Sequence, residues 1–344
     1  MVEKTADEDE PIDDDHRLKT YLVTGASGFV GGYLVRHLLD QGIRVRAMVR
    51  DENNAKDLKG LGVEVVVAEL WDADSLVRAV TGVRGVYHIA ALFRQHGFAD
   101  RIFREVNADG TRRLLDASIQ AGVRRFIHCS TVGVLGDIVH PPADESTPYG
   151  PGDIYQQTKM EGEKLALEAF RSGQMSGVVI RPAMIYGPGD QRTLKLFRMI
   201  ARKRFFYVGR GLALVHWIDV RDLVRAFQLA MDHQERNGEI YMIAGKSQMP
   251  LRTLCEEVAG QLGVSPPWLS LPVRPIQWAG SLCEVLCRPW GIEPPLYRRR
   301  VDFYTKHRSF DGSKAERELG FTPSRTFKEE VADIIASYQE TQML

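Results

Sequence analysis

The sequence predicts an α/β fold, with a doubly wound parallel sheet and a smaller mixed C-terminal lobe. Short apolar runs alternate with amphipathic runs through the first half of the chain, and the connections between them are short. The chemically distinctive residues follow the apolar runs, at the edge where parallel sheets bind ligands. With 344 residues, of which 44% are hydrophobic and 26% charged, the chain is long enough for one large core and a second lobe.

The expected strands and helices follow from this alternation. Apolar runs predict strands, which cover residues 20–24, 44–49, 63–68, 85–90, 125–130 and 177–182. Amphipathic runs predict helices, which cover residues 29–41, 72–81, 101–121 and 155–172. Beyond Pro182 the pattern is less regular, although residues 213–244 return to a strand–helix–strand rhythm. We therefore expect a parallel sheet wrapped by helices.

A glycine-rich turn joins the first expected strand to the first expected helix. Residues 24–31 read Thr-Gly-Ala-Ser-Gly-Phe-Val-Gly. Unpaired backbone N–H groups and the helix dipole make such a helix start an anion site. Gly25 permits the tight turn, Gly28 lets the backbone approach a pyrophosphate, and Gly31 lets the helix pack on the strand. The spacing is G-x-x-G-x-x-G rather than the commoner G-x-G-x-x-G, and its context predicts a dinucleotide-binding Rossmann domain.

The domain organisation follows from this motif and from composition. Residues 1–16 are strongly acidic, and we expect a disordered tail there. The Rossmann domain is expected at residues 17–185, with residues 213–244 returning to it. A substrate-binding lobe is expected from residues 186–212 together with residues 245–344.

Composition excludes several kinds of partner and site. The formal net charge is zero, with 45 basic and 45 acidic residues, so no overall field favours nucleic acid or a membrane. The N-terminus lacks the apolar core of a signal peptide, and no apolar run is long enough to span a bilayer, so we expect a cytoplasmic protein. The four cysteines, Cys129, Cys255, Cys283 and Cys287, show no metal-ligand spacing, so we expect no bound metal. Cys283 and Cys287 are four residues apart and are expected to be two reduced, partly buried thiols.

A tyrosine and a lysine are spaced for acid–base chemistry. Of the 11 tyrosines, only Tyr155 has a lysine four residues further on, at Lys159, and this spacing places both side chains on one helix face. An ammonium group beside a phenol favours the phenolate and lowers its pKa, and the lysine could also bind a nicotinamide ribose. A coincidental surface pair is the alternative. The strand before them ends in two hydroxyls, Ser130 and Thr131, which could hold a substrate carbonyl or alcohol.

These motifs together resemble the extended short-chain dehydrogenases/reductases, in the branch of the 3β-hydroxysteroid dehydrogenases and dihydroflavonol reductases. The matching segments keep the family's order and spacing, and are residues 24–31, 86–91, 107–111, 130–136, 155–159 and 181–190. The resemblance implies that Tyr155 is the general acid/base, that Lys159 assists it and holds the ribose, and that Thr131, or as second choice Ser130, contacts the substrate. It also implies a homodimer through the helix that carries Tyr155.

The resemblance implies a set of cofactor-binding residues as well. Besides Tyr155 and Lys159 they are Gly25, Ser27, Gly28, Phe29, Val30, Gly31, Ala90, Ala91, Asn107, Pro182 and Ala183. His88 lies inside an expected strand, and we interpret it as a core histidine with satisfied hydrogen bonds.

The end of the second strand bears on the choice between NAD and NADP. NAD sites usually carry an acid there to bind the ribose hydroxyls, but this chain has Val49 followed by Arg50. A guanidinium could bind a 2′-phosphate bidentately, so we expect NADP. NAD stays possible, since Asp51 could neutralise Arg50 or turn toward a ribose. In the next strand–helix turn Glu69 and Leu70 stand where relatives carry Asp-Leu, and are expected at the adenine.

Three functions from different classes remain. The first is an oxidoreductase that interconverts a secondary alcohol and a ketone on a bulky sterol-, terpenoid- or flavonoid-like small molecule. The second is a nucleotide-sugar epimerase or dehydratase with tightly bound NAD, whose diphosphate could contact Arg192, Lys195 and Arg198. The third is a non-catalytic NADP-binding regulatory protein, which would not need the tyrosine, the lysine and the threonine.

The apolar segment from Ile276 to Leu286 carries Trp278 and Leu282 on one helical stripe. It predicts either a lid over an apolar substrate or plain core packing, and core packing is the favoured interpretation.

Overall fold

The computed structural model of the chain describes residues 19–93, 98–287, 301 and 304–344, without the side chains of residues 284–286. The expected acidic tail lies outside the described residues. None of the described helices combines the length and the apolar character that crossing a bilayer requires.

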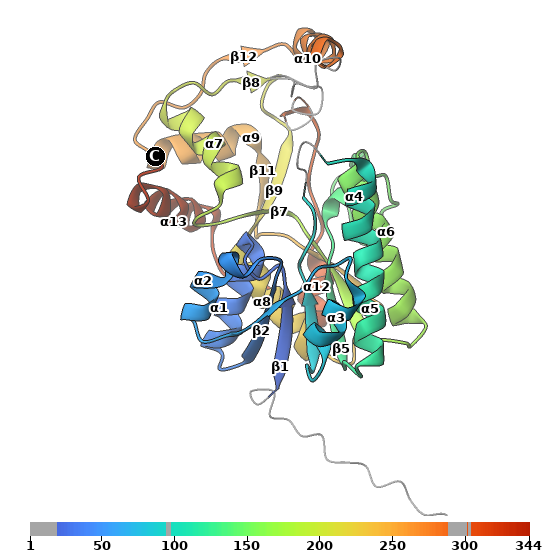
Figure 1. The fold of residues 1–344 in the computed structure, drawn as a ribbon. Helices are drawn as coiled ribbons and strands as arrows, with labels where there is room; N and C mark the ends of the chain where they lie inside the picture. Colours follow the sequence, from blue (N-terminus) through green and yellow to red (C-terminus); the bar gives the residue numbers. More distant parts are fainter. Residues whose placement is uncertain (1–18, 94–97, 288–300, 302–303) are drawn as a thin grey trace, which may run out of the picture.

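A seven-stranded parallel sheet forms the main body, with helices on both faces (Figure 1), which confirms the predicted fold class. In spatial order its strands are β10 (Ile240–Ile243), β6 (Gly177–Pro182), β5 (Arg125–Cys129), β4 (Gly85–His88), β1 (Thr20–Thr24), β2 (Arg44–Val49) and β3 (Glu64–Val67). Because β1 lies between β2 and β4, the direction of winding reverses there, and the carboxyl ends of these strands border a crevice. All six expected strands are present, within two residues at each end.

Each face of the sheet is covered by its own helix layer. One layer consists of α1 (Phe29–Asp40), α8 (Val220–Asp232) and α12 (Ser313–Leu319), with the short α2 (Lys56–Gly60) beside it. The other consists of α3 (Ala73–Val80), α4 (Asp100–Arg104), α5 (Gly110–Gln120) and α6 (Ile154–Arg171). The helix predicted over residues 101–121 is interrupted by a π-helical turn at Glu105–Asp109, which separates α4 from α5.

The smaller lobe has two small sheets and a core of its own. Its strands are β7 (Met184–Tyr186), β9 (Leu214–Asp219) and β11 (Gln248–Pro250) in one sheet, and β8 (Tyr207–Val208) with β12 (Ser270–Leu271) in the other. Its helices are α7 (Gln191–Ala201), α9 (Leu251–Gln261), α10 (Val273–Cys287) and α13 (Phe327–Glu340). Since β9 pairs with β7 and β11, the chain returns to the main body only from Val220 onward, later than the sequence pattern indicated.

Helix α10 does not bury its apolar stripe. Trp278 is 79% exposed and Leu282 is 60% exposed. The interpretation of this stripe as core packing is therefore wrong. Neither side chain lines the large cavity of the molecule. Trp278 and Leu282 therefore do not form a lid over that cavity in the described structure.

Candidate active site

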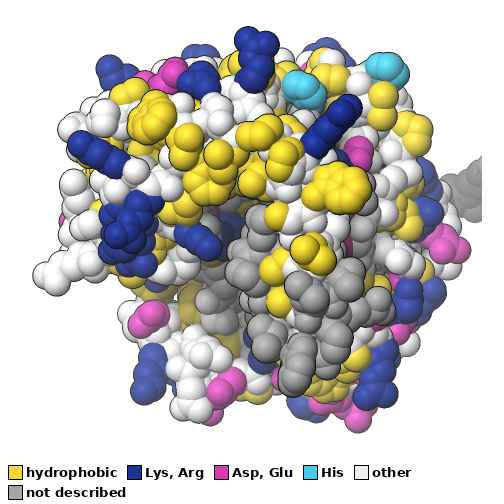
Figure 2. Space-filling view, turned by 90° about the horizontal axis from the view of Figure 1, so that it is seen from above, with side chains coloured by type: hydrophobic (Ala, Val, Ile, Leu, Met, Phe, Trp, Pro, Cys, Tyr) yellow, Lys and Arg dark blue, Asp and Glu magenta, His cyan; other side chains and the backbone are white. Residues whose placement is uncertain are grey.

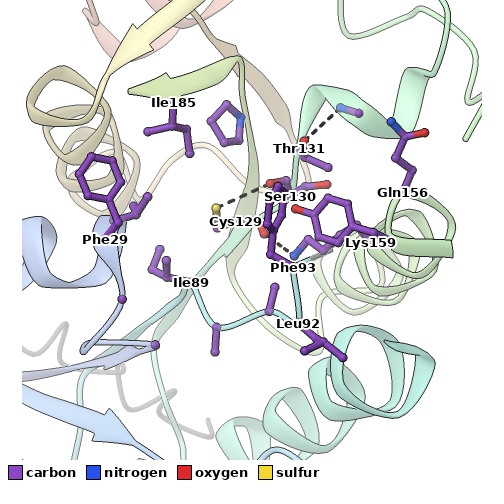
Figure 3. A pocket seen from close by; sticks show the side chains of 18 of the residues that line it. Phe29, Ile89, Leu92, Phe93, Cys129, Ser130, Thr131, Gln156, Lys159 and Ile185 are labelled. Carbon is purple, nitrogen blue, oxygen red and sulfur yellow. Dashed lines mark hydrogen bonds between the residues drawn. The ribbon is translucent and has the colours of Figure 1, made fainter. Parts of the chain in front are cut away.

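A cavity of about 1790 Å³ lies at the carboxyl ends of the central strands and extends into the smaller lobe. Figure 3 shows its interior, with Phe29 and Ile89 on one side and Thr131, Gln156 and Lys159 on the other. Of the residues that the resemblance implies for catalysis and cofactor binding, together with Arg50, Glu69 and Leu70, all but Asn107 line it. Segments more than a hundred residues apart in the sequence therefore meet at one site.

The glycine turn leaves room for a phosphate group. A Cβ added at Gly31 would lie 2.1 Å from the carbonyl oxygen of Gly25, so a side chain there would break the packing of α1 on the turn. Gly25 has a φ of +67°, and a Cβ added to it would lie 3.0 Å from the backbone of Ala90. Gly28 is the N-cap of α1 and provides no side chain to cap the first turn. This helix start opens on the cavity and fits the pyrophosphate of a dinucleotide.

Arg50 lies at one end of the cavity, with Asn54, Glu69 and Trp71 lining the same region. Burial raises the pKa of the Glu69 carboxyl, and the nearby Arg50 guanidinium opposes that rise. The Asp51 side chain accepts a hydrogen bond from the backbone N–H of Asn53, 2.9 Å away, where it caps the short helical turn Glu52–Ala55. Asp51 is thus committed to its own turn. Sequence reasoning did not find Trp71.

The cavity side of α6 carries Tyr155 and Lys159 one turn apart. Asp153 caps the helix by accepting from the backbone N–H of Gln156, 2.8 Å away. The Lys159 Nζ donates to the carbonyl oxygen of Cys129, 2.6 Å away, and burial lowers the pKa of its ammonium group. Tyr155 is buried, and the ring of Phe93 meets it edge to face with 5.0 Å between centroids. The helix thus holds a phenol and an amine at the end of β5, as the spacing predicted.

The two hydroxyls after β5 have different surroundings. The Thr131 Oγ1 accepts from the backbone N–H of Gly133, 3.1 Å away, and so begins the short helical turn Val132–Leu135. The Ser130 Oγ donates to the carboxylate of Glu163. Ser130 is therefore engaged with a buried group of α6, whereas the Thr131 hydroxyl keeps a hydrogen to donate toward the cavity.

A buried charged network that sequence reasoning missed lies behind this wall. Arg181 donates to Glu163 with an Nη2–Oε1 distance of 2.6 Å, and both side chains are almost fully buried. The Tyr149 hydroxyl donates to the same carboxylate over 2.7 Å. Two signals were available in the sequence: an arginine inside an otherwise apolar strand, and a glutamate four residues after Lys159.

Asn107 and His88 lie beneath the cavity floor. Asn107 does not line the cavity; its Oδ1 accepts from the backbone N–H of Leu92 (2.7 Å), and its Nδ2 donates to Thr158 (3.1 Å). The prediction placed Asn107 beside the cofactor. The structure places it behind the cavity wall instead, where it holds the backbone of Leu92, a residue of that wall. His88 contacts the hydroxyls of Thr24 and Thr111 at 3.0 Å each, and burial lowers its pKa to about 3. This confirms the interpretation of His88 as a satisfied core histidine.

The substrate end of the cavity is mostly apolar around Tyr155. The apolar side chains that line it include Leu92, Phe93, Phe98, Phe103, Val106, Ile154, Met184, Ile185 and Leu196. Sequence reasoning missed the aromatic members because residues 92–103 follow no regular period. Among the described residues, no cluster of His, Cys, Asp or Glu could hold a metal ion.

The cations at this end differ from those expected. Arg192 lines the cavity but is paired with Asp190 at 2.8 Å, while Lys195 and Arg198 do not line it. Lys306 and Arg308 line it instead, and Lys306 pairs with Asp137 at 2.6 Å. Two of the three basic residues expected at the cavity are therefore outside it, and the segment after residue 305 provides two others.

Comparisons with known proteins agree with this geometry. The model of the NAD dependent epimerase/dehydratase family matches residues 21–244. Sterol demethylase protein B of Methylococcus capsulatus is 33% identical, over 94% of this chain and 100% of that protein. The 3beta-hydroxysteroid-dehydrogenase/decarboxylase isoform 1 of Arabidopsis thaliana is 30% identical, over 92% of this chain and 79% of that protein.

Solved structures share the fold over nearly the whole chain. That of gox2253 has a TM-score of 0.80 and 31% identity, and covers 95% of this chain and 99% of that chain. The dTDP-glucose 4,6-dehydratase DesIV from Streptomyces venezuelae, solved with NAD bound, has a TM-score of 0.73 and 26% identity, and covers 94% and 98%.

Proposed function

The chain belongs to the NAD dependent epimerase/dehydratase family, and on that premise we propose that it interconverts a secondary alcohol and a ketone on a bulky, apolar substrate. It is an NAD(P)-dependent oxidoreductase of the extended short-chain dehydrogenase/reductase type. The observation that carries the proposal is the apolar wall around Tyr155, formed by Leu92, Phe93, Phe103 and Ile154, which suits an aliphatic or aromatic substrate. Two relatives named for sterol chemistry support the choice of a fused-ring or polyprenyl compound.

The residues that would hold the dinucleotide are those of the cavity. The glycine turn and the start of α1 would take the pyrophosphate, Arg50 and Glu69 would lie at the adenosine, and Lys159 would bind the ribose of the nicotinamide. When bound, the nicotinamide supplies or accepts the hydride. A homodimer through α6 stays a prediction.

The chain's own residues would move the proton. In the reductive direction Tyr155 donates its phenolic proton to the oxygen of the carbonyl, and in the oxidative direction its phenolate accepts the proton of the alcohol. The positive charge of Lys159 on the same helix face stabilises that phenolate. The Thr131 hydroxyl donates a second hydrogen bond to the substrate oxygen. The apolar walls exclude water from this exchange and strengthen both electrostatic contacts.

The cations of the cavity give the epimerase alternative less support than the sequence suggested. Of the three expected to bind a nucleotide diphosphate only Arg192 lines the cavity, and it is paired with Asp190; of the two cations that line it instead, Lys306 is paired with Asp137. A partly satisfied guanidinium is a weaker diphosphate ligand than a free cluster of three cations. We therefore favour net oxidation or reduction over epimerisation.

The proposal is tested with a panel of ketones and NADPH. We expect consumption of NADPH with fused-ring or polyprenyl ketones, at one equivalent per alcohol formed, and little with small hydrophilic ketones, because the apolar wall contributes to binding only for large substrates. Interconversion of UDP- or dTDP-sugars without net change in the nicotinamide, and no activity on apolar ketones, would contradict the proposal.

We further propose that the preferred coenzyme is NADP, because of Arg50. Replacing it by glutamate puts a like charge beside the 2′-phosphate and removes a charge-assisted hydrogen bond, which is worth roughly 1.5–3 kcal/mol. The Arg50→Glu variant should therefore raise KM for NADPH about 10- to 100-fold, with a much smaller effect on KM for NADH.

The matched control is Arg44→Glu. Arg44 begins the same strand at its far end, is exposed, and does not line the cavity, so both KM values should stay unchanged. Equal changes for NADH and NADPH in the Arg50→Glu variant would show that Arg50 does not read the 2′-phosphate.

A further inference from the structure

α10, β8 and β12 lie at the end of the smaller lobe farthest from the main body (Figure 1), and these elements and the segments next to them carry exposed apolar side chains. We call Leu212, Trp268, Leu269, Trp278 and Leu282 the apical patch. Trp268 is 84% exposed, and Trp278 nearly as much. Moving such side chains out of water is favourable, and tryptophan is highly buried on average, so this exposure needs a cause.

The members of the apical patch come from two segments that the fold brings together. β8 pairs with β12 through Tyr207 and Ser270, and the Tyr207 N–H donates to the carbonyl oxygen of Leu269, so the segment that carries Trp268 and Leu269 lies beside β8. At the same place a Cβ added to Gly209 would lie 3.1 Å from Val273, the first residue of α10. Figure 2 shows this end from above, with apolar side chains spread over it and Lys and Arg side chains among them.

The charge in the segments of the apical patch is mainly positive. Residues 202–214 and 264–287, which run to the end of α10, contain five basic residues and one acidic residue, Glu284, although the whole chain has a formal net charge of zero. The five are Arg202, Lys203, Arg204, Arg210 and Arg274, and all are exposed. None of them forms an ion pair with another residue that the structure describes. Indole rings and leucines beside unpaired cations are the composition of a surface that binds lipid headgroups.

We propose that the apical patch docks on the surface of an anionic lipid bilayer. The tryptophans and leucines enter the headgroup region, and the five cations attract the negative lipids. A second copy of this chain fits less well, because two such faces would bring ten cations together with only two carboxylates in these segments to pair with them. The proposal concerns a surface outside the cavity and is independent of the proposed function.

The experiment measures sedimentation of the full chain with vesicles of phosphatidylcholine, alone or mixed with phosphatidylglycerol. We expect the protein to partition onto the mixed vesicles and to be released by high salt. The Trp268→Ser/Trp278→Ser variant should lower the partition coefficient about tenfold or more, and the Arg202→Ser/Lys203→Ser/Arg204→Ser variant should remove the preference for the anionic vesicles. The matched control, Val77→Ser, changes an exposed apolar residue of α3 in the main body and should bind as the wild type does.

The same variants also show whether the fold and the cavity stay intact. Their circular dichroism and NADPH binding should equal those of the wild type, because the apical patch lies outside the cavity. Wild-type protein that stays in the supernatant with anionic vesicles would overturn the proposal. So would a wild-type dimer in sedimentation equilibrium that the Trp268→Ser/Trp278→Ser variant converts to a monomer, since a second copy would then cover the patch.

Discussion

The Tyr155→Phe variant should lose about 10²–10⁴-fold in kcat, because it removes only the oxygen that transfers the proton. The ring stays in place against Phe93 and against its apolar neighbours Leu92 and Phe103, so the wall of the cavity and the fold should be unchanged. Cofactor affinity should stay within about threefold, since a phenol-to-phenyl change removes at most one weak contact to the coenzyme. Steady-state kinetics and fluorescence titration with NADPH measure the two quantities separately.

A matched control separates the chemistry from the loss of any buried tyrosine hydroxyl. Tyr241 on β10 is buried, and its hydroxyl donates to Glu318 over 3.0 Å, outside the cavity. The Tyr241→Phe variant should keep wild-type kcat. Full activity in the Tyr155→Phe variant, or an equal loss in both variants, would remove Tyr155 from the proposed role.

The second large effect concerns the buried pair of Arg181 and Glu163. The Arg181→Met variant leaves a carboxylate buried without its cation, which costs about 3–5 kcal/mol of the free energy of unfolding. Removing both charges, in Arg181→Met/Glu163→Leu, should cost clearly less than the sum of the single changes, because a packed apolar pair replaces the ion pair. The remaining cost comes from the Ser130 and Tyr149 hydroxyls, which both lose their acceptor, at about 1–3 kcal/mol for a buried hydroxyl. Denaturant unfolding followed by circular dichroism measures all three variants.

A more exposed ion pair, between α4 and the same helix α6, is the control. Arg104 pairs with Glu161 at 2.9 Å on the solvent side of α6, and water screens this pair. The Arg104→Met variant should therefore change stability little. Equal stability of the Arg181→Met and Arg104→Met variants would contradict this account of the buried pair. So would a double variant whose loss of stability equals the sum of the losses in Arg181→Met and Glu163→Leu, because the two residues would then not be coupled.

The sheet and most of the site could be predicted from sequence because the signals are local. Each central strand is a short apolar run, and parallel strands end at one edge, so Thr131, Tyr155 and the glycine turn meet there without any knowledge of contacts. The pairing of Tyr155 with Lys159 is also local, since one helical turn sets it.

What could not be predicted depends on contacts between distant segments or on backbone detail. The resemblance placed Asn107 at the cofactor, but the residue stands in a π-helical turn that leaves no period in the sequence, and its side chain binds the backbone of Leu92 behind the wall. The partners Glu163 and Arg181 are on different elements, and nothing in either segment specifies the other. An apolar stripe such as that of α10 normally packs on a core, and the sequence alone does not show that Trp278 lies outside it.

The most direct test of net oxidoreduction is the identity of the nucleotide that the purified protein carries. The protein is denatured, and mass spectrometry identifies and counts what is released. An enzyme that turns over its coenzyme must exchange it in every cycle, so we predict far less than one nucleotide per chain and readily reversible binding of added NADPH. One equivalent of NAD per chain that survives purification would contradict the account, because a nicotinamide that never leaves belongs to an enzyme that returns its hydride to the substrate.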